Sequence, residues 1–100
     1  MRKPVPARHL KELYQLLAAP KSPEEAELLL KDLATPQELE AFAERWQLVQ
    51  MLAKGTTQRE VARKLGVSIS KVTRGSKWLQ YGNGGFIHFL KKLKIAKRKK

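Results

Sequence analysis

The chain has 100 residues, no cysteine and a formal net charge of +12, which results from 21 Lys and Arg against 9 Asp and Glu. This length predicts one domain, and the lack of cysteine excludes disulfides, a thiolate nucleophile and cysteine-based metal sites. No apolar run approaches the ~20 residues of a membrane-spanning helix, and the N-terminal stretch lacks the apolar segment of a secretory signal. We therefore expect a cytoplasmic protein of a single domain, residues 1–100, that does not enter a membrane.

The positive charge is concentrated in the second half of the chain. Residues 1–44 carry six basic and eight acidic side chains, whereas residues 45–100 carry fifteen basic and one acidic side chain. Such an asymmetry favours a polyanionic partner, and double-stranded nucleic acid is the commonest one. The alternative is a solvated face that only keeps the chain soluble.

Three helices are predicted in the first half of the chain. Leucine spacing predicts one over residues 7–18, and the capping boxes SPEE at residues 22–25 and TPQE at residues 35–38 begin the next two. The third helix is the longest and ends at Gly55. Its apolar residues lie on more than one face, which predicts burial on more than one side. Because the chain is short, we expect residues 7–55 to form the core of a homodimer.

The sequence of residues 57–79 predicts a helix-turn-helix. A third capping box, TQRE at residues 57–60, begins a short helix that ends before Gly66. Gly66 can adopt the positive φ of a tight turn, and Ser68 is the expected N-cap of the following helix. The alternative is a plain helical corner, which uses the same types of residue.

A short helix and a basic tail follow this motif. The glycine-rich segment YGNGG separates the motif from an amphipathic helix predicted over residues 86–93, and residues 94–100 form a lysine-rich tail. No alternating run of β-branched residues predicts a strand. The predicted fold class is therefore all-α, with about six helices.

The second helix of the motif presents polar and basic side chains within the basic half of the chain. Side chains of this kind reach phosphates and base edges in a DNA groove. We expect the basic ones to hold phosphates, and the others to face base edges directly or through water. The predicted DNA contacts are Gln58, Arg59, Ile69, Ser70, Lys71, Thr73 and Lys77.

Several short motifs resemble the bacterial tryptophan repressor family. They are TP at residues 35–36, ER at 44–45, TQRE at 57–60 and VTRGS at 72–76, and the similarity extends over about residues 10–93. RW at 45–46 together with YGNGG is similar to the YerC/YecD-type branch of that superfamily. The resemblance implies an intertwined homodimer of six helices per subunit, a repressor of operator DNA and L-tryptophan as corepressor.

The resemblance also implies a ligand pocket. By position, Arg45 and Arg74 would lie on the two sides of the indole ring, Thr35 near the pocket entrance, and Gly75 would leave room for the ligand. Taken alone, Arg45 could instead form an ion pair on the helix surface, and Arg74 could contact a phosphate. Trp78 stands where the family has a serine that helps to bind the amino group of the ligand. It either fills the pocket, which makes the protein able to bind DNA constitutively, without a ligand, or packs into the core and leaves ligand binding intact.

The sequence thus predicts a DNA-binding transcriptional repressor that is switched by a small aromatic ligand. One alternative keeps the fold and binds DNA without a ligand, for which Trp78 is the main argument. Another is a basic RNA- or ribosome-associated protein, which would need exposed aromatic residues to stack on unpaired bases. No Ser/His/Asp arrangement, carboxylate pair, nucleotide loop or metal-ligand spacing indicates an enzyme, a metal site or a bound cofactor.

Overall fold

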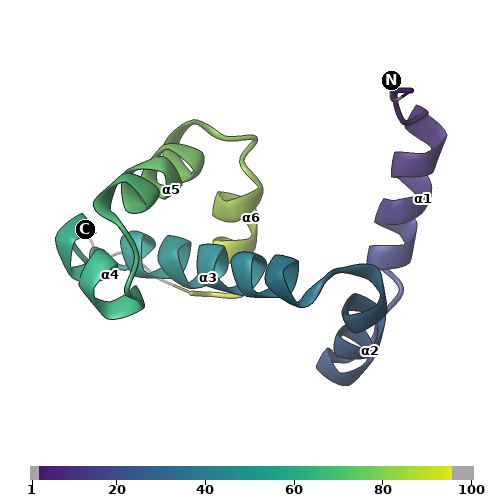
Figure 1. Cartoon of the computed structure of the whole chain (residues 1–100), viewed down its shortest axis with the longest axis horizontal. Coiled ribbons are helices and arrows are strands. Elements are labelled where there is room, and N and C mark those ends of the chain that lie inside the picture. Colours follow the sequence, from purple (N-terminus) through teal and green to yellow (C-terminus); the bar gives the residue numbers. More distant parts are fainter. Residues whose placement is uncertain (1–2, 96–100) are drawn as a thin grey trace. The chain divides into compact units, whose positions relative to one another are not determined.

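The computed structural model describes residues 3–95, and over that range the chain forms six α-helices and no strand (Figure 1). This confirms the predicted all-α fold. The predicted tail of residues 94–100 lies outside the described residues from residue 96 onwards. The helices are α1 (Ala7–Leu17), α2 (Pro23–Leu33), α3 (Pro36–Ala53), α4 (Gln58–Leu65), α5 (Ile69–Tyr81) and α6 (Gly85–Lys92).

Serine and threonine side chains begin four of these helices. In each case the hydroxyl oxygen accepts a hydrogen bond from the backbone N–H three residues further on, which satisfies a donor that has no partner inside the helix. At α3 the cap is reciprocal, because the Glu38 carboxylate also accepts the Thr35 N–H at 2.8 Å. The four capping residues are Ser22, Thr35, Thr57 and Ser68.

The chain divides into two compact units, the first of which ends at Leu39 and the second of which begins at Glu40. In the first unit, helices α1 and α2 contain no buried residue. Large apolar side chains on these two helices are exposed, among them Tyr14 at 61% and Leu28 at 73%.

Among the described helices, none combines the length and the apolar character of a transmembrane segment.

The second unit has an apolar core to which four helices contribute. Leu48 and Val49 come from α3, Val61 from α4, Val72 from α5 and Leu90 from α6, and all five are buried. Burial of each such side chain stabilises the fold by about 1.5–3 kcal/mol. This core holds α4, α5 and α6 around the C-terminal part of α3 (Figure 1).

Helices α3 and α5 approach each other closely at Gly75. A Cβ atom at this position would overlap Cδ2 of Leu48, which is itself only 1% exposed. A side chain at this position would therefore require Leu48 to move. The sequence interpretation gave Gly75 a different role, that of leaving room for a ligand.

Candidate nucleic-acid interface and aromatic cavity

Helices α4 and α5 form the predicted helix-turn-helix. The turn between them contains Gly66 in the left-handed conformation, at φ 68° and ψ 36°, a region that favours glycine. The N–H of Val67 then donates to the carbonyl of Ala62 at 3.1 Å, which closes the end of α4. Ser68 accepts the Lys71 N–H at 3.1 Å and begins α5. The local chemistry of the turn thus fixes the angle between the two helices.

Two of the predicted DNA contacts hydrogen bond to each other across the motif. The Thr73 hydroxyl of α5 donates to Oε1 of Gln58, the first residue of α4, at 3.0 Å. Because the amide oxygen of Gln58 is an acceptor in this bond, its NH2 group is the part of the side chain that can donate to DNA. The bond orients Gln58 and ties the start of α4 to α5.

A third predicted contact, Lys71, forms an ion pair with Glu44 of α3. Lys71 Nζ lies 3.0 Å from Glu44 Oε1, and the two side chains are 50% and 34% exposed. The carboxylate and a DNA phosphate are both anions, so they would compete for the same ammonium group.

The predicted DNA contacts are exposed, except for the partly buried Thr73. Ile69 is notable among them, because this large apolar side chain is 50% exposed at the first position of α5. An exposed apolar side chain at that position can contact the methyl group of thymine.

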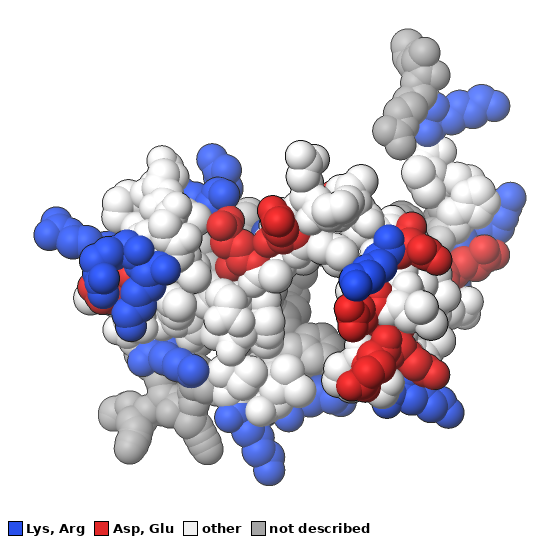
Figure 2. Space-filling view, turned by 60° about the horizontal axis from the view of Figure 1, so that its bottom comes forward, with Lys and Arg blue, Asp and Glu red and all other residues white. Residues whose placement is uncertain are grey.

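Basic side chains gather over α4 in the second unit, on the left of the view in Figure 2. Within that group Arg63 forms an ion pair with Glu60, and the hydrogen bond from Arg63 lowers the pKa of the Glu60 carboxyl. Glu60 therefore stays ionised well below neutral pH and neutralises part of the positive charge of α4. Arg59 of the same helix, a predicted phosphate contact, is exposed.

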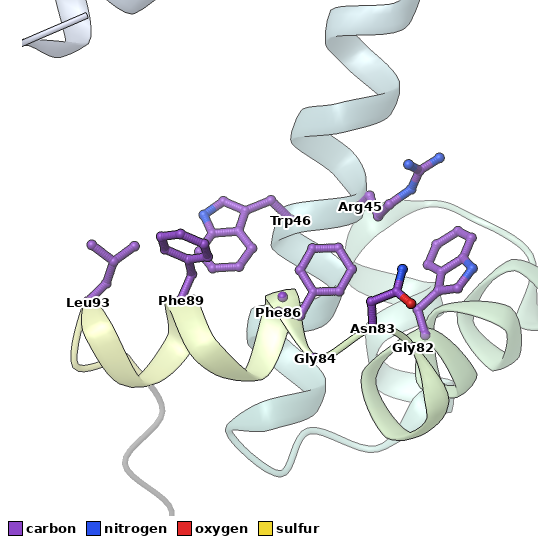
Figure 3. Close-up of a pocket in the computed structure, with 10 residues that line it drawn as sticks. Arg45, Trp46, Gly82, Asn83, Gly84, Phe86, Phe89 and Leu93 are labelled. Atoms are coloured by element: carbon purple, nitrogen blue, oxygen red, sulfur yellow. The ribbon is translucent and has the colours of Figure 1, made fainter. Parts of the chain in front are cut away.

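An open cavity of about 670 Å³ lies beside the motif in the second unit (Figure 3). Four of its ten lining residues are aromatic, and the rings of Trp46 and Phe86 stack with their centroids 6.1 Å apart and their planes 23° from parallel. Arg45 and Asn83 supply polar groups. The lining residues are Arg45 and Trp46 of α3, Trp78 of α5, Gly82, Asn83 and Gly84 of the turn, and Gly85, Phe86 and Phe89 of α6 with Leu93 after it.

Arg45 and Trp78, both predicted as ligand residues, contact each other at this cavity. The guanidinium carbon of Arg45 lies 4.6 Å from the centroid of the Trp78 ring, within the ~6 Å range of a cation–π interaction. Trp78 is half-buried and lies at the cavity rather than in the apolar core. The structure thus places Trp78 beside Arg45 at the cavity.

Two other predicted ligand residues of the second unit, Arg74 and Gly75, do not line this cavity. Arg74 is exposed on α5 and does not line the cavity. Gly75 does not line it either, because this residue packs against Leu48. Thr35 belongs to the first unit, where its hydroxyl caps α3.

Sequence reasoning missed the cavity residues Trp46, Phe86 and Phe89, as well as the partner of Lys71. The spacing of Phe86 and Phe89, three apart on one predicted helix, is a signal that could have indicated a shared face. No local signal indicates that Trp46 stacks on Phe86. Among residues 3–95, no group of three or more His, Asp and Glu side chains could hold a metal ion.

An all-α chain that carries an exposed helix-turn-helix has the fold of a DNA-binding regulator, which is not that of an enzyme family. The family described as Trp repressor protein matches residues 8–94. The chain therefore belongs to the Trp repressor family.

Relatives and a solved structure agree with this assignment. The chain is 40% identical over 83 residues to a Trp operon repressor homolog of Chlamydia caviae, covering 82% of each chain. It is 28% identical over 87 residues to the Bacillus subtilis protein YerC, covering 87% of this chain and 84% of that one. A crystal structure of a TrpR-like protein from Eubacterium eligens superposes with a TM-score of 0.86 at 25% identity, covering 92% of this chain and 95% of that one.

Proposed function

We propose that the chain is a sequence-specific, DNA-binding transcriptional repressor that acts as a homodimer in the cytoplasm. The observation that carries this proposal is the exposed α5 helix, which is fixed to α4 by a glycine turn and by the bond between Thr73 and Gln58. A helix held in this way presents its side chains in one fixed arrangement, as sequence recognition requires. The strong positive charge of residues 45–100 supplies attraction to the DNA backbone.

The side chains of the motif divide into two groups by chemistry. The long basic ones hold phosphates and set the position of the protein on the duplex. The shorter and apolar ones at the start of α5 face base edges, and Gln58 donates from its NH2 group. The phosphate contacts are Arg59, Lys71 and Lys77, and the base-facing residues are Ile69, Ser70 and Thr73.

The exposed apolar side chains of α1 and α2 support a homodimer. Tyr14 and Leu28 are more than half exposed, and apolar surface of this extent is typical of an interface. In this proposal residues 7–55 form the dimer core, residues 57–79 the DNA-binding motif and residues 86–93 the C-terminal helix, while residues 94–100 add phosphate contacts. Helix-turn-helix dimers, the Trp repressor among them, bind two half-sites about one turn of DNA apart.

Control by a small molecule has two candidates. Relatives are named for the Trp operon, which makes L-tryptophan a candidate corepressor at Arg45, with Arg74 and Thr35 as the other ligand residues that the resemblance implies. The contact between Arg45 and Trp78 supports the second candidate, a regulator that binds DNA without a free ligand.

Selection from a library of random DNA duplexes tests the proposal. The full chain is incubated with the library at fixed salt, and bound duplexes are sequenced over several rounds. We expect enrichment of a two-fold symmetric site with half-sites about one turn apart, and a dimer mass in sedimentation. Lys54, an exposed lysine outside the motif, gives a control variant, Lys54→Ala, which should select the same site. Uniform binding to all duplexes, preference for structured RNA, or a monomer mass would contradict the proposal.

A further inference from the structure

We infer that Trp78 is a built-in aromatic ligand of Arg45, so that the DNA-binding arrangement of α5 forms without free L-tryptophan. This inference rests on the proposed function, because it concerns how that function is controlled. Its starting point is the 4.6 Å separation between the Arg45 guanidinium carbon and the Trp78 ring. The ring at this position is an indole, which is the same ring that free tryptophan would bring.

The separation leaves no room for a second ring. A planar ligand between the guanidinium and the indole would need about 3.5 Å on each side, or about 7 Å in all. The observed separation is 4.6 Å. A free indole can therefore stack on this face of Arg45 only if Trp78 leaves it.

Covalent attachment favours Trp78 in that competition. A group on the same chain meets its partner at an effective concentration in the millimolar range or above, and helix α5 already holds Trp78 beside α3. Free tryptophan would also have to bind without the help of Gly75, which packs against Leu48. The face of Arg45 that contacts Trp78 is thus occupied in the ligand-free chain.

The contact lies where it can control α5. Lys71 and Trp78 are seven residues apart on α5, which is about two helical turns and places them on one side of the helix. They contact neighbouring residues of α3, Lys71 with Glu44 and Trp78 with Arg45. Helix α5 therefore contacts α3 near both of its ends, and loss of the Trp78 ring would remove the side-chain contact with Arg45 near the C-terminal end.

Chemical rescue tests the inference. The DNA affinity of the full chain for its selected site is measured by fluorescence anisotropy, with and without millimolar L-tryptophan. We expect the wild type to bind without L-tryptophan and to change less than about twofold when it is added. Trp78→Ala should bind about tenfold more weakly, and added L-tryptophan or indole should restore most of the loss. Trp78→Phe keeps an aromatic face and should stay close to the wild type.

Two further variants make the test specific. Tyr81, an aromatic residue of α5 that is 80% exposed, gives the control Tyr81→Ala, which should bind like the wild type. Arg45→Lys keeps the charge and loses the planar guanidinium, so its weakened binding should not respond to L-tryptophan. Circular dichroism establishes that each variant is folded.

The outcomes separate this inference from the proposed function. A wild type that binds its site only when L-tryptophan is present would overturn the inference and leave the proposed repressor intact. A folded Trp78→Ala variant with wild-type affinity, or one with weak affinity that no free ring restores, would also overturn it. If Trp78→Ala does not fold, the L-tryptophan titration of the wild type decides. A wild type that selects no DNA site with or without L-tryptophan would contradict the proposed function itself.

Discussion

Lys71 of the second motif helix lies 3.0 Å from the carboxylate of Glu44, although 27 residues separate the two in sequence. The ion pair joins a predicted phosphate-binding lysine to α3, which bears no predicted DNA contact. It orients the lysine and at the same time supplies an anion that a phosphate must replace. Both consequences can be measured.

Lys71→Ala should weaken binding to every DNA sequence by a similar factor. The reason is that a phosphate contact carries no base information, and the slope of log affinity against log salt should fall by roughly one unit. Anisotropy titrations at several salt concentrations, on the selected site and on a scrambled duplex, measure both effects. Lys54→Ala is the matched control. A loss of preference at a single base pair would show that Lys71 reads a base instead.

Glu44→Gln should strengthen DNA binding. The change removes the anion that competes with phosphate, and because the pair is partly exposed, its ion-pair energy is about 0–1 kcal/mol. That range corresponds to a gain of at most about fivefold in affinity, equal on specific and scrambled duplexes. Glu40, an exposed carboxylate one turn earlier on α3, gives the control Glu40→Gln. Weaker binding of Glu44→Gln would mean that orienting Lys71 matters more than releasing it.

Gly75→Ala should destabilise the protein, although alanine favours a helix by about 1 kcal/mol over glycine. The added methyl group would overlap buried Leu48, and overpacking of this kind costs about 1–3 kcal/mol. Urea unfolding followed by circular dichroism measures the free energy of unfolding. Gly85→Ala is the control, since a Cβ at Gly85 meets no atom within 4 Å. Equal or greater stability of Gly75→Ala would show that Leu48 can move aside.

Gly66→Ala should also destabilise the fold, for a reason of backbone conformation. At φ 68° the residue is left-handed, and an alanine in that region costs about 1–2 kcal/mol. A Cβ atom at this position meets no other atom within 4 Å, so steric overlap with other residues adds nothing to the loss of stability. Gly66→Asn should lose less, because asparagine tolerates this conformation better than alanine does. Thermal unfolding of the two variants gives the order, and an asparagine variant less stable than the alanine variant would contradict this account.

The helices and their starts could be predicted from the sequence, because capping boxes and glycine turns act within a few residues. Helix α5 continues to Tyr81, two residues beyond the predicted end, since the N–H of Gly82 still bonds to the carbonyl of Trp78 at 3.0 Å. Helix α6 likewise begins at Gly85, one residue before the prediction.

The candidate site could be predicted less well, because its contacts depend on how helices pack. The resemblance assigned both Arg45 and Trp78 to a pocket, but their stacking depends on the angle between α3 and α5. The same is true of Glu44 and Lys71, which no local pattern connects. The packing of Gly75 against Leu48 likewise depends on the facing helix, and no local pattern predicts it.

Glu44 and Arg45 are neighbours on α3, so their contacts with Lys71 and Trp78 depend on the same rotational position of that helix. Each residue of an α-helix is rotated by about 100° from the one before it. A single residue inserted between Arg45 and the buried Leu48 would therefore turn both side chains away from α5 together, while the core residues stayed in place. A deletion there would do the same. Length changes in α3 between these positions would thus remove both the Lys71–Glu44 ion pair and the Trp78–Arg45 contact at once, even though every residue that faces DNA remained unchanged.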